Sequence, residues 1–259
     1  MRPSVVASSL LLLLPLVAEA AVKSKVIEYT QGDTVLQGYL SWDDAHTGPR
    51  PGILVVHDWT GVGPYAQGRC EQLAGLGYVA FAADIYGKGV RPQTPQEAGA
   101  QATIYKKDRA LMRARVNAGL DELRRQPGVD PKRIAAIGYC FGGTAVIELA
   151  RSGADIAGVV SFHGGLDSPD PASGKNIKCK VLVCTGADDR AVPPAQIAAF
   201  EDEMRQARVD YQVNIYGGAV HAFTNPASGN DPSPNVAYNA DADRRSWRAM
   251  KDFFAEIFK

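Results

Sequence analysis

The alternation of apolar runs with amphipathic segments predicts an α/β fold with a mostly parallel sheet. Apolar runs such as 52–56 and 78–83 are short and continuous, which is typical of strands buried on both faces. Helix-like segments separate most of these runs, and strands alternating with helices form parallel sheets with right-handed crossovers. No internal repeat or shift in composition divides the chain, so we expect a single domain over residues 21–259.

The first twenty residues have the pattern of a secretory signal. Arg2 precedes an apolar stretch over 5–17, and Ala18-Glu19-Ala20 provides a small-x-small cleavage site. The stretch is short for a bilayer span and is followed by polar sequence. We therefore expect residues 1–20 to be removed and the mature protein to be exported, to the periplasm in a bacterium, without a membrane anchor.

The remaining elements follow from periodicity and turn residues. An alternating pattern around Gln31-Gly32-Asp33 predicts a hairpin at the start of the mature chain. The final helix is amphipathic, with large apolar residues spaced for burial. Strands are expected at 25–29, 34–40, 52–56, 78–83, 133–139, 156–162, 181–185 and 211–216, and helices at 65–76, twice within 95–125, after Cys140, at 194–207 and at the C-terminus.

The charge balance excludes some partners. Lys and Arg total 28, Asp and Glu total 28, and no basic stripe is present, so we expect no nucleic-acid partner. No His, Asp and Cys spacing of the metal-ligand kind occurs, so no metal site is expected. A soluble enzyme or binding protein, as a monomer or small homo-oligomer, is the expected class.

One strand runs into a Gly-x-Cys-x-Gly turn. The apolar run ends in Gly138-Tyr139-Cys140-Phe141-Gly142, and a helical pattern begins at once. A sharp strand-to-helix turn strains its apex and needs glycines on either side. The turn fits a nucleophile elbow with cysteine at its apex, although a buried structural thiol among close-packed glycines would have the same pattern.

Three other cysteines are expected to be packing residues. Cys179 and Cys184 flank a predicted strand and stand too far apart along it to bridge. If Cys140 is a free nucleophile, an odd number remains. We therefore expect Cys70, Cys179 and Cys184 to be buried and reduced.

Cys140, Asp189 and His221 each follow an apolar strand. Functional groups of open α/β sheets collect in loops at the carboxyl ends of strands. The order nucleophile, acid, histidine is the order of an α/β-hydrolase triad. Taken singly, Asp189 also fits a turn acid and His221 an ordinary loop histidine.

Together these segments resemble the dienelactone hydrolase family of α/β-hydrolases. The resemblance rests on 138–143, the Asp189-Arg190-Ala191-Val192-Pro193 turn and His221-Ala222-Phe223, and it extends over nearly the whole mature chain. It implies the α/β-hydrolase fold, with about eight strands and helices on both faces. It also implies a cofactor-free hydrolase acting on a small ester or lactone through a Cys-His-Asp triad.

The resemblance assigns a role to each member of the triad. Cys140 would attack the carbonyl carbon and form a thioester acyl-enzyme. His221 would take the thiol proton and later activate water, and Asp189 would hold the imidazole tautomer. Asp189 is preferred to Asp188 because it directly precedes the matching turn. The alternatives are a thioesterase or acyltransferase on the same fold, and a non-enzymatic thiol sensor or binding protein.

The loop after the third strand would complete the reaction site. The resemblance places the backbone N–H groups of Trp59 and Phe141 as oxyanion donors. Asp58 stands where the family has a glutamate that contacts the resting thiol; it also fits a helix N-terminal acid or a hydrogen bond to loop backbone.

Four further residues are assigned to the substrate pocket. Lys88 and Asn225 stand at the positions of two arginines that hold a substrate carboxylate in the family, which favours a neutral ester or lactone here. Lys88 also fits a solvated loop charge. Phe223 belongs to the matching His-x-Phe segment. His163 follows a strand and is expected to be a pocket or structural residue.

Overall fold

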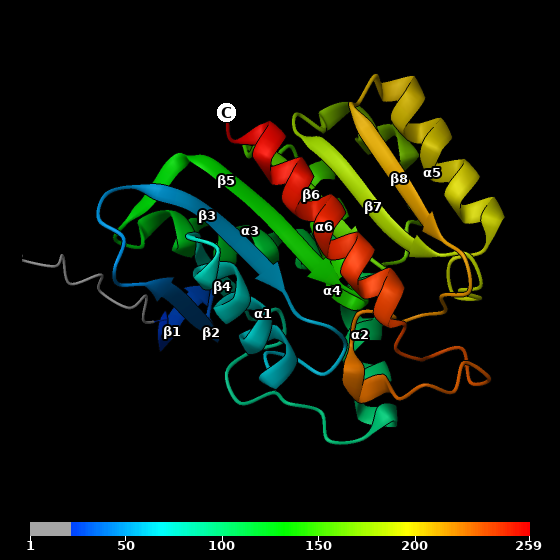
Figure 1. The fold of residues 1–259 in the computed structure, drawn as a ribbon, viewed down its shortest axis with the longest axis horizontal. Helices are drawn as coiled ribbons and strands as arrows, with labels where there is room; N and C mark the ends of the chain where they lie inside the picture. The colour runs from blue at the N-terminus through cyan, green and yellow to red at the C-terminus, as the bar shows by residue number, and fades with distance from the viewer. Residues whose placement is uncertain (1–21) are drawn as a thin grey trace, which may run out of the picture.

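The computed structural model describes residues 22–259, and their strands form one sheet (Figure 1). Its order is β1-β2-β4-β3-β5-β6-β7-β8. The predicted signal at 1–20 lies outside the described residues. The strands are β1 (Val22–Gln31), β2 (Thr34–Asp43), β3 (Arg50–Val56), β4 (Val79–Ala83), β5 (Val129–Tyr139), β6 (Gly158–Phe162), β7 (Lys180–Gly186) and β8 (Tyr211–Tyr216).

Six of the strands are parallel. β1 and β2 form the predicted hairpin, whose turn contains Gly32 at a φ of 54°, and β2 pairs antiparallel with β4. From β4 through β3 and β5 to β8 every pairing is parallel. The predicted α/β-hydrolase architecture is confirmed, and the carboxyl ends of the parallel strands meet along one edge.

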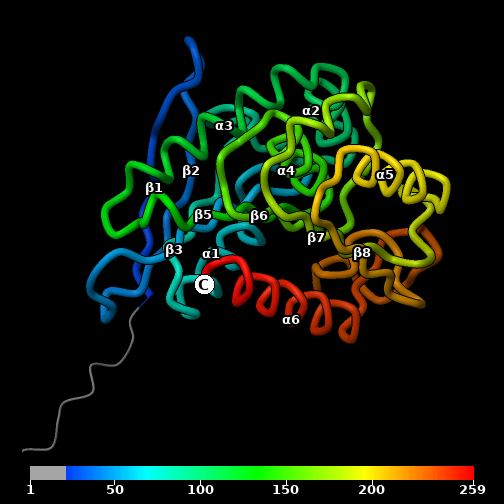
Figure 2. Tube along the Cα trace, turned by 90° about the horizontal axis from the view of Figure 1, so that it is seen from above, coloured from blue at the N-terminus to red at the C-terminus, as the bar shows by residue number. Residues whose placement is uncertain are grey.

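Helices cover both faces of the sheet (Figure 2). α1 and α6 lie on one face, and α2, α3, α4 and α5 lie on the other. No helix within 22–259 is both long enough and apolar enough to cross a membrane. The helices are α1 (Pro64–Gly75), α2 (Pro95–Lys107), α3 (Arg109–Arg125), α4 (Phe141–Arg151), α5 (Pro194–Ala207) and α6 (Ala240–Ile257), with short 3₁₀ turns η1 (Pro171–Asn176) and η2 (Pro226–Ser228).

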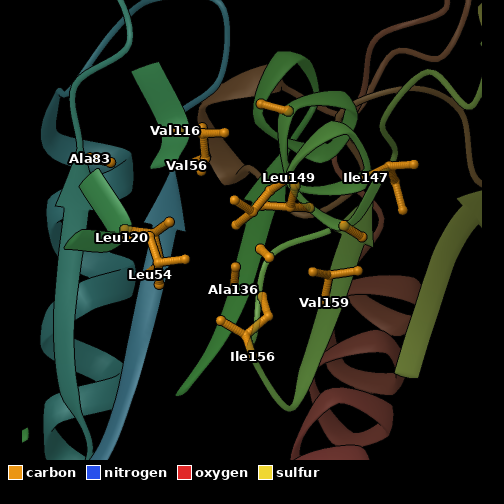
Figure 3. Close-up of a cluster of buried hydrophobic side chains, with 14 of the residues drawn as sticks. Leu54, Val56, Ala83, Val116, Leu120, Ala136, Ile147, Leu149, Ile156 and Val159 are labelled. Atoms are coloured by element: carbon orange, nitrogen blue, oxygen red, sulfur yellow. The ribbon is translucent and has the colours of Figure 1, made fainter. Parts of the chain in front are cut away.

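The core forms two layers, one under each set of helices. Figure 3 shows Leu54 of β3 and Leu120 of α3 together in the layer that also contains Leu149 of α4 and Val159 of β6. Each of these side chains is almost fully buried, which corresponds to about 1.5–3 kcal/mol of transfer free energy per residue. This layer anchors α4, the helix that begins at the elbow.

β5 is longer than the sequence pattern predicts. It begins at Val129 rather than 133, and its register against β3 shifts between Pro51 and Gly52. Pro131 interrupts the apolar pattern, because proline cannot donate to a strand ladder. The irregularity ends before Ile134, so the part of β5 that leads to the elbow is regular.

The cysteines are unbridged. Cys70, Cys179 and Cys184 are buried free thiols, as expected, and Cys140 is partly buried. Burial raises the pKa of the Cys179 thiol to about 12, and it raises the pKa values of the Cys70 and Cys184 thiols as well. These three thiols are therefore neutral and unreactive at physiological pH.

Candidate active site

Cys140 occupies a strained turn between β5 and α4. Its φ of 54° and ψ of −114° lie outside the regions that L-residues ordinarily adopt. A Cβ on Gly138 would lie 2.0 Å from the carbonyl oxygen of Gly142, and a Cβ on Gly142 would lie 2.2 Å from the carbonyl oxygen of Val56. Only glycine fits at either position, so the turn has the geometry of a nucleophile elbow.

Three loops bring the predicted triad together. Cys140 follows β5, Asp189 follows β7 and His221 follows β8. His221 Nε2 lies 3.0 Å from Cys140 Sγ, and His221 Nδ1 lies 2.9 Å from Asp189 Oδ2. Both distances are within hydrogen-bonding range, so the carboxylate, imidazole and thiol form one continuous hydrogen-bonded chain.

The electrostatics of this hydrogen-bonded chain favour a charged imidazole. Burial alone lowers the pKa of His221, but the negative charge of a Cys140 thiolate and the hydrogen bonds with Asp189 and Cys140 outweigh it and raise that pKa to about 10. His221 is therefore protonated at neutral pH, with its charge opposite the Cys140 sulfur. A cation beside a cysteine sulfur favours the thiolate, which is the nucleophilic form of cysteine.

Asp189 is held by groups from its own turn and from a distant loop. Its Oδ1 accepts the N–H of Ala191 at 2.8 Å and lies 3.4 Å from Asn235 Nδ2. Asn235 Oδ1 in turn accepts the N–H of Arg190 at 2.9 Å. Asn235 lies in the loop between η2 and α6, which has no strand-end signal, and sequence reasoning missed it.

The same loop also supports His221. Val236 pairs with His221 in an isolated parallel bridge, and the N–H of Ala237 donates to the carbonyl oxygen of His221 at 3.1 Å. The segment therefore acts as a short extra strand beside the histidine loop. It fixes the backbone from which the imidazole projects.

Two backbone amides near Cys140 have no hydrogen-bond acceptor among the described residues. Within the part of the chain that the structure describes, the backbone N–H groups of Trp59 and Phe141 donate to no protein acceptor. Phe141 is the first residue of α4, where the helix dipole is positive, and Trp59 lines the same cavity as Cys140. The positions fit the predicted oxyanion donors.

Asp58 hydrogen-bonds to its own loop. Its Oδ1 accepts both the N–H of Thr60 at 2.8 Å and the Thr60 hydroxyl at 2.5 Å. This is the loop-backbone role that the sequence left open. Asp58 also lines the cavity with Cys140, so its influence on the thiol stays a prediction.

His163 lies under the nucleophile as well as in the pocket. Its Nδ1 accepts the backbone N–H of Cys140 at 3.1 Å, and its Nε2 lies 2.7 Å from Thr224 Oγ1. Burial, followed by the charges of His221 and Arg69, lowers the pKa of His163 well below its ordinary value. The ring is neutral, and with Nδ1 accepting, Nε2–H donates to Thr224, a partner that sequence reasoning missed.

A cavity of about 330 Å³ is lined by Cys140 and His221 of the triad. It is the size of a small-molecule site. Lys106 of α2 contributes a cation to its wall that sequence reasoning missed, because nothing in the pattern orients α2. The lining residues include Asp58, Trp59, Tyr65, Lys106, Cys140, His163, Val192, His221, Asn225, Asn235 and Val236.

Two residues assigned to the pocket do not line this cavity. Lys88 lies in a surface loop, where its Nζ pairs with Glu28 Oε1 at 2.7 Å, and both side chains are about half exposed. Phe223 is fully buried and packs edge-on against the His163 ring, with centroids 5.1 Å apart. The position of Lys88 agrees with the alternative interpretation of the sequence, a solvated loop charge. Phe223 contributes to the core beside His163, which lines the cavity, because burial of an aromatic ring is favourable.

The described residues contain no group of three or more His, Cys, Asp or Glu side chains arranged to hold a metal ion. The ring nitrogens of His163 and His221 are instead paired with other protein atoms.

Known proteins resemble the chain over most of its length. A dienelactone hydrolase-like promiscuous phosphotriesterase from metagenomic libraries shares 41% sequence identity, with a TM-score of 0.88, and the match covers 92% of this chain and 100% of that chain. A Yersinia pestis protein named "Putative carboxymethylenebutenolidase" is 26% identical over 238 residues, covering 88% of this chain and 85% of that protein.

A third comparison supports the fold alone. The dienelactone hydrolase of Anabaena variabilis ATCC 29413 shares 20% identity at a TM-score of 0.66, and the match covers 92% of this chain and 99% of that one. The model of the dienelactone hydrolase family matches residues 36–258, which include every residue of the site described above. The chain therefore belongs to the dienelactone hydrolase family and is a hydrolase of the ester or lactone type.

Proposed function

We propose that the protein hydrolyses a small carboxylic ester or lactone through Cys140, His221 and Asp189, with a thioester acyl-enzyme. One observation carries the proposal. At the apex of a strained elbow, the thiol, imidazole and carboxylate stand in line at 3.0 and 2.9 Å. A nucleophile within reach of a base that a third group orients is the general arrangement for covalent catalysis.

Acylation would begin from the charged pair. The Cys140 thiolate attacks the carbonyl carbon, and the negative charge that develops on the carbonyl oxygen is stabilised by the N–H groups of Trp59 and Phe141. When the intermediate collapses, the carbon–oxygen bond to the leaving alcohol breaks. His221 gives its proton to that oxygen, and a thioester on Cys140 remains.

In deacylation, His221 would accept a proton instead of donating one. Neutral His221 now takes a proton from water, and the water oxygen attacks the thioester carbon. The carbon–sulfur bond breaks, the carboxylic acid leaves, and the thiolate again faces a protonated imidazole. Asp189 holds Nδ1–H throughout, which keeps Nε2 directed toward the sulfur.

The cavity favours a substrate without net charge. Trp59, Val192 and Val236 provide apolar wall, and Asn225 provides a neutral amide. Apart from the Cys140–His221 pair, the wall has one acidic side chain, Asp58, and one basic side chain, Lys106. Because Lys88 pairs with Glu28 on the surface, Lys106 is the one lysine or arginine among the described residues that line the cavity.

Substitution of the nucleophile tests the proposal. Cys140→Ala is expected to abolish hydrolysis of p-nitrophenyl butyrate and of a neutral aromatic lactone, while circular dichroism and melting temperature stay close to wild type. Cys70→Ala is a suitable control, because that thiol is fully buried outside the cavity. Undiminished turnover by Cys140→Ala would exclude the mechanism. Trapping the acyl group on Cys140 by rapid acid quench and mass spectrometry would identify the thioester.

The alternatives differ in what accepts the acyl group. A thioesterase would prefer thioester substrates, and an acyltransferase would divert the acyl group to an added alcohol or amine in preference to water. A thiol sensor would alkylate rapidly at Cys140 without any ester turnover. Product analysis in the presence of methanol separates these cases.

A neutral phosphotriester is a second candidate substrate. The relative at 41% identity is described as a promiscuous phosphotriesterase, and the match covers that whole chain. The thiolate would attack phosphorus and displace p-nitrophenolate while the nearby N–H groups stabilise the charge on the phosphoryl oxygen. Water would then attack phosphorus and break the sulfur–phosphorus bond, which releases the phosphodiester. Release of p-nitrophenol from a p-nitrophenyl phosphotriester, and its loss in Cys140→Ala, would support this activity.

Export of the protein is also proposed. It rests on the signal-like pattern of residues 1–20. Expression of the full chain in a Gram-negative host, followed by fractionation and N-terminal sequencing, is expected to yield a periplasmic protein that begins at Ala21. A cytoplasmic protein that retains Met1 would contradict it.

A further inference from the structure

His57, at the end of β3, is buried and has both ring nitrogens engaged. Its Nε2 accepts the backbone N–H of Ile85 at 3.2 Å, and its Nδ1 lies 2.5 Å from the carbonyl oxygen of Asp58. An amide can only donate, so Nε2 must be the acceptor. The ring proton therefore resides on Nδ1, where it donates to Asp58.

The ring is also held in place by aromatic contacts. It stacks on Phe141, with centroids 5.8 Å apart, and meets Tyr86 edge-on at 4.8 Å. Burial lowers the pKa of His57, which agrees with a neutral ring carrying a single proton. The position and tautomer of His57 are thus fixed from three directions.

The Asp58 carbonyl, which accepts from His57 Nδ1 and, at 3.4 Å, from the Gly61 N–H, belongs to the same peptide as the Trp59 N–H. That peptide is trans, and in a trans peptide the C=O and N–H groups point in opposite directions. Drawing the Asp58 carbonyl toward the buried ring therefore turns the Trp59 N–H away from it, to the side where Asp58 and Trp59 line the cavity.

The next peptide is fixed as well. The Tyr86 hydroxyl donates to the carbonyl oxygen of Trp59 at 3.1 Å, and the Asp58 carboxylate accepts from Thr60. With its flanking peptides held, the Trp59 amide cannot rotate without breaking several hydrogen bonds. Among residues 59–61, the backbone N–H groups of Thr60 and Gly61 have acceptors. The Trp59 N–H has none in the described part of the chain.

We propose that His57 is a positioning residue for the oxyanion hole: its Nδ1–H fixes the orientation of the Asp58–Trp59 peptide and so aims the Trp59 N–H at the developing oxyanion. The inference rests on the proposed function, because it assigns His57 to the acylation step of that site. A hydrogen bond to the carbonyl also polarises the peptide, which makes its N–H a stronger donor.

The test compares three substitutions that differ in where they place a donor. His57→Asn puts its amide nitrogen close to the Nδ1 position and can still donate to Asp58. His57→Gln reaches toward Ile85 instead and has no donor near Asp58. His57→Leu has neither group. Loss of one oxyanion donor lowers kcat by about 100- to 1,000-fold, so a misaimed donor is expected to lower it by about 10- to 100-fold.

We expect kcat for ester hydrolysis to fall in the order wild type, Asn, Gln, Leu, with KM changed by less than about 3-fold. The second readout is the rate at which iodoacetamide alkylates Cys140. Alkylation displaces iodide at a saturated carbon and develops no oxyanion, so it is expected to stay within about 2-fold of wild type in all three variants.

Each other outcome overturns the proposal. If the Gln variant turns over as fast as the Asn variant, the donor to Asp58 is unimportant. If alkylation falls in parallel with turnover, His57 supports only the elbow through its stack on Phe141. Failure of the underlying mechanism would look different, since wild type would then lack turnover or Cys140→Ala would retain it.

Discussion

Gly138→Ala is expected to damage both the fold and the reaction. The glycine is adjacent to the elbow, and its φ is not in the left-handed region, so alanine introduces no backbone strain of its own. The effect is steric. A Cβ there would lie 2.0 Å from Gly142 O and 2.2 Å from Gly142 C, and both are backbone atoms at the start of α4.

The size of the effect follows from these distances. Real Cβ contacts are essentially never shorter than 3.0 Å, so β5 and α4 must separate by about 1 Å. Overpacking of a buried site costs about 1–3 kcal/mol, and a clash with backbone on both sides belongs at the upper end or beyond. About 3 kcal/mol corresponds to a fall in melting temperature of about 6–12 °C for a domain of this size.

Catalysis is expected to fall further than stability. A shift of about 1 Å in a reacting group can reduce the rate about 100-fold. Thermal unfolding followed by circular dichroism, and kcat/KM for p-nitrophenyl butyrate at 25 °C, measure the two effects on the same sample.

Gly99→Ala is the matched control. Gly99 lies within α2, and a Cβ there would meet no atom within 4 Å. Alanine in a helix interior is more stable than glycine by about 1 kcal/mol, so this variant is expected to melt slightly higher and react normally. The reasoning is refuted if Gly138→Ala melts within about 2 °C of wild type and retains its turnover.

Three further predictions follow from the site and its supports. The pKa of His221 is raised to about 10, so the leaving group loses its proton donor as pH rises through that value. Ester turnover is therefore expected to fall there, whereas the rate of Cys140 alkylation is not. The pH profiles of both rates check this. Asn235→Ala removes a contact to Asp189 and is expected to lower kcat by about 3- to 10-fold at unchanged alkylation rate, and steady-state kinetics measure it. Arg151→Leu leaves the buried Glu203 carboxylate without its ion pair and removes one of the two arginines that pair with Glu148, and it is expected to cost about 3–5 kcal/mol, measured by urea unfolding.

Much of the site was predictable because its chemistry sits at strand ends. Cys140, Asp189 and His221 each follow a predicted strand, and parallel strands bring such ends to one edge. The elbow glycines add a steric signal that can be read locally. The fold itself was predictable for the same reason, since period, length and turn residues agreed along the chain.

The supports were not predictable, because each connects segments distant in sequence. Asn235 reaches Asp189 across 46 positions, and Thr224 reaches His163 across 61. Both come from turns that carry no periodicity and no strand-end signal. Lys106 enters the cavity only because α2 packs beside the site, which depends on tertiary packing alone.

Two residues assigned to the pocket lie outside the cavity lining for a shared physical reason. Lys88 and Phe223 were placed by resemblance to positions in related chains, whereas their environments depend on local partners. Lys88 pairs with Glu28 of β1 at the surface, and Phe223 has a buried aromatic contact with the His163 ring. Matching positions predict the path of the backbone better than they predict where a long or bulky side chain points.

The two sides of the reacting centre are held by different means. On the thiol side, Cys140 is fixed by close contacts between backbones and by the hydrogen bond from its N–H to His163. On the base side, His221 depends on the loop that contains Asn235 and Val236, whose hold consists of hydrogen bonds at a partly exposed surface. Hydrogen bonds of this kind open more easily than packed backbone. Substitutions in that loop should therefore alter proton transfer while leaving the nucleophile in place, which is why alkylation and turnover together locate the step that each variant affects.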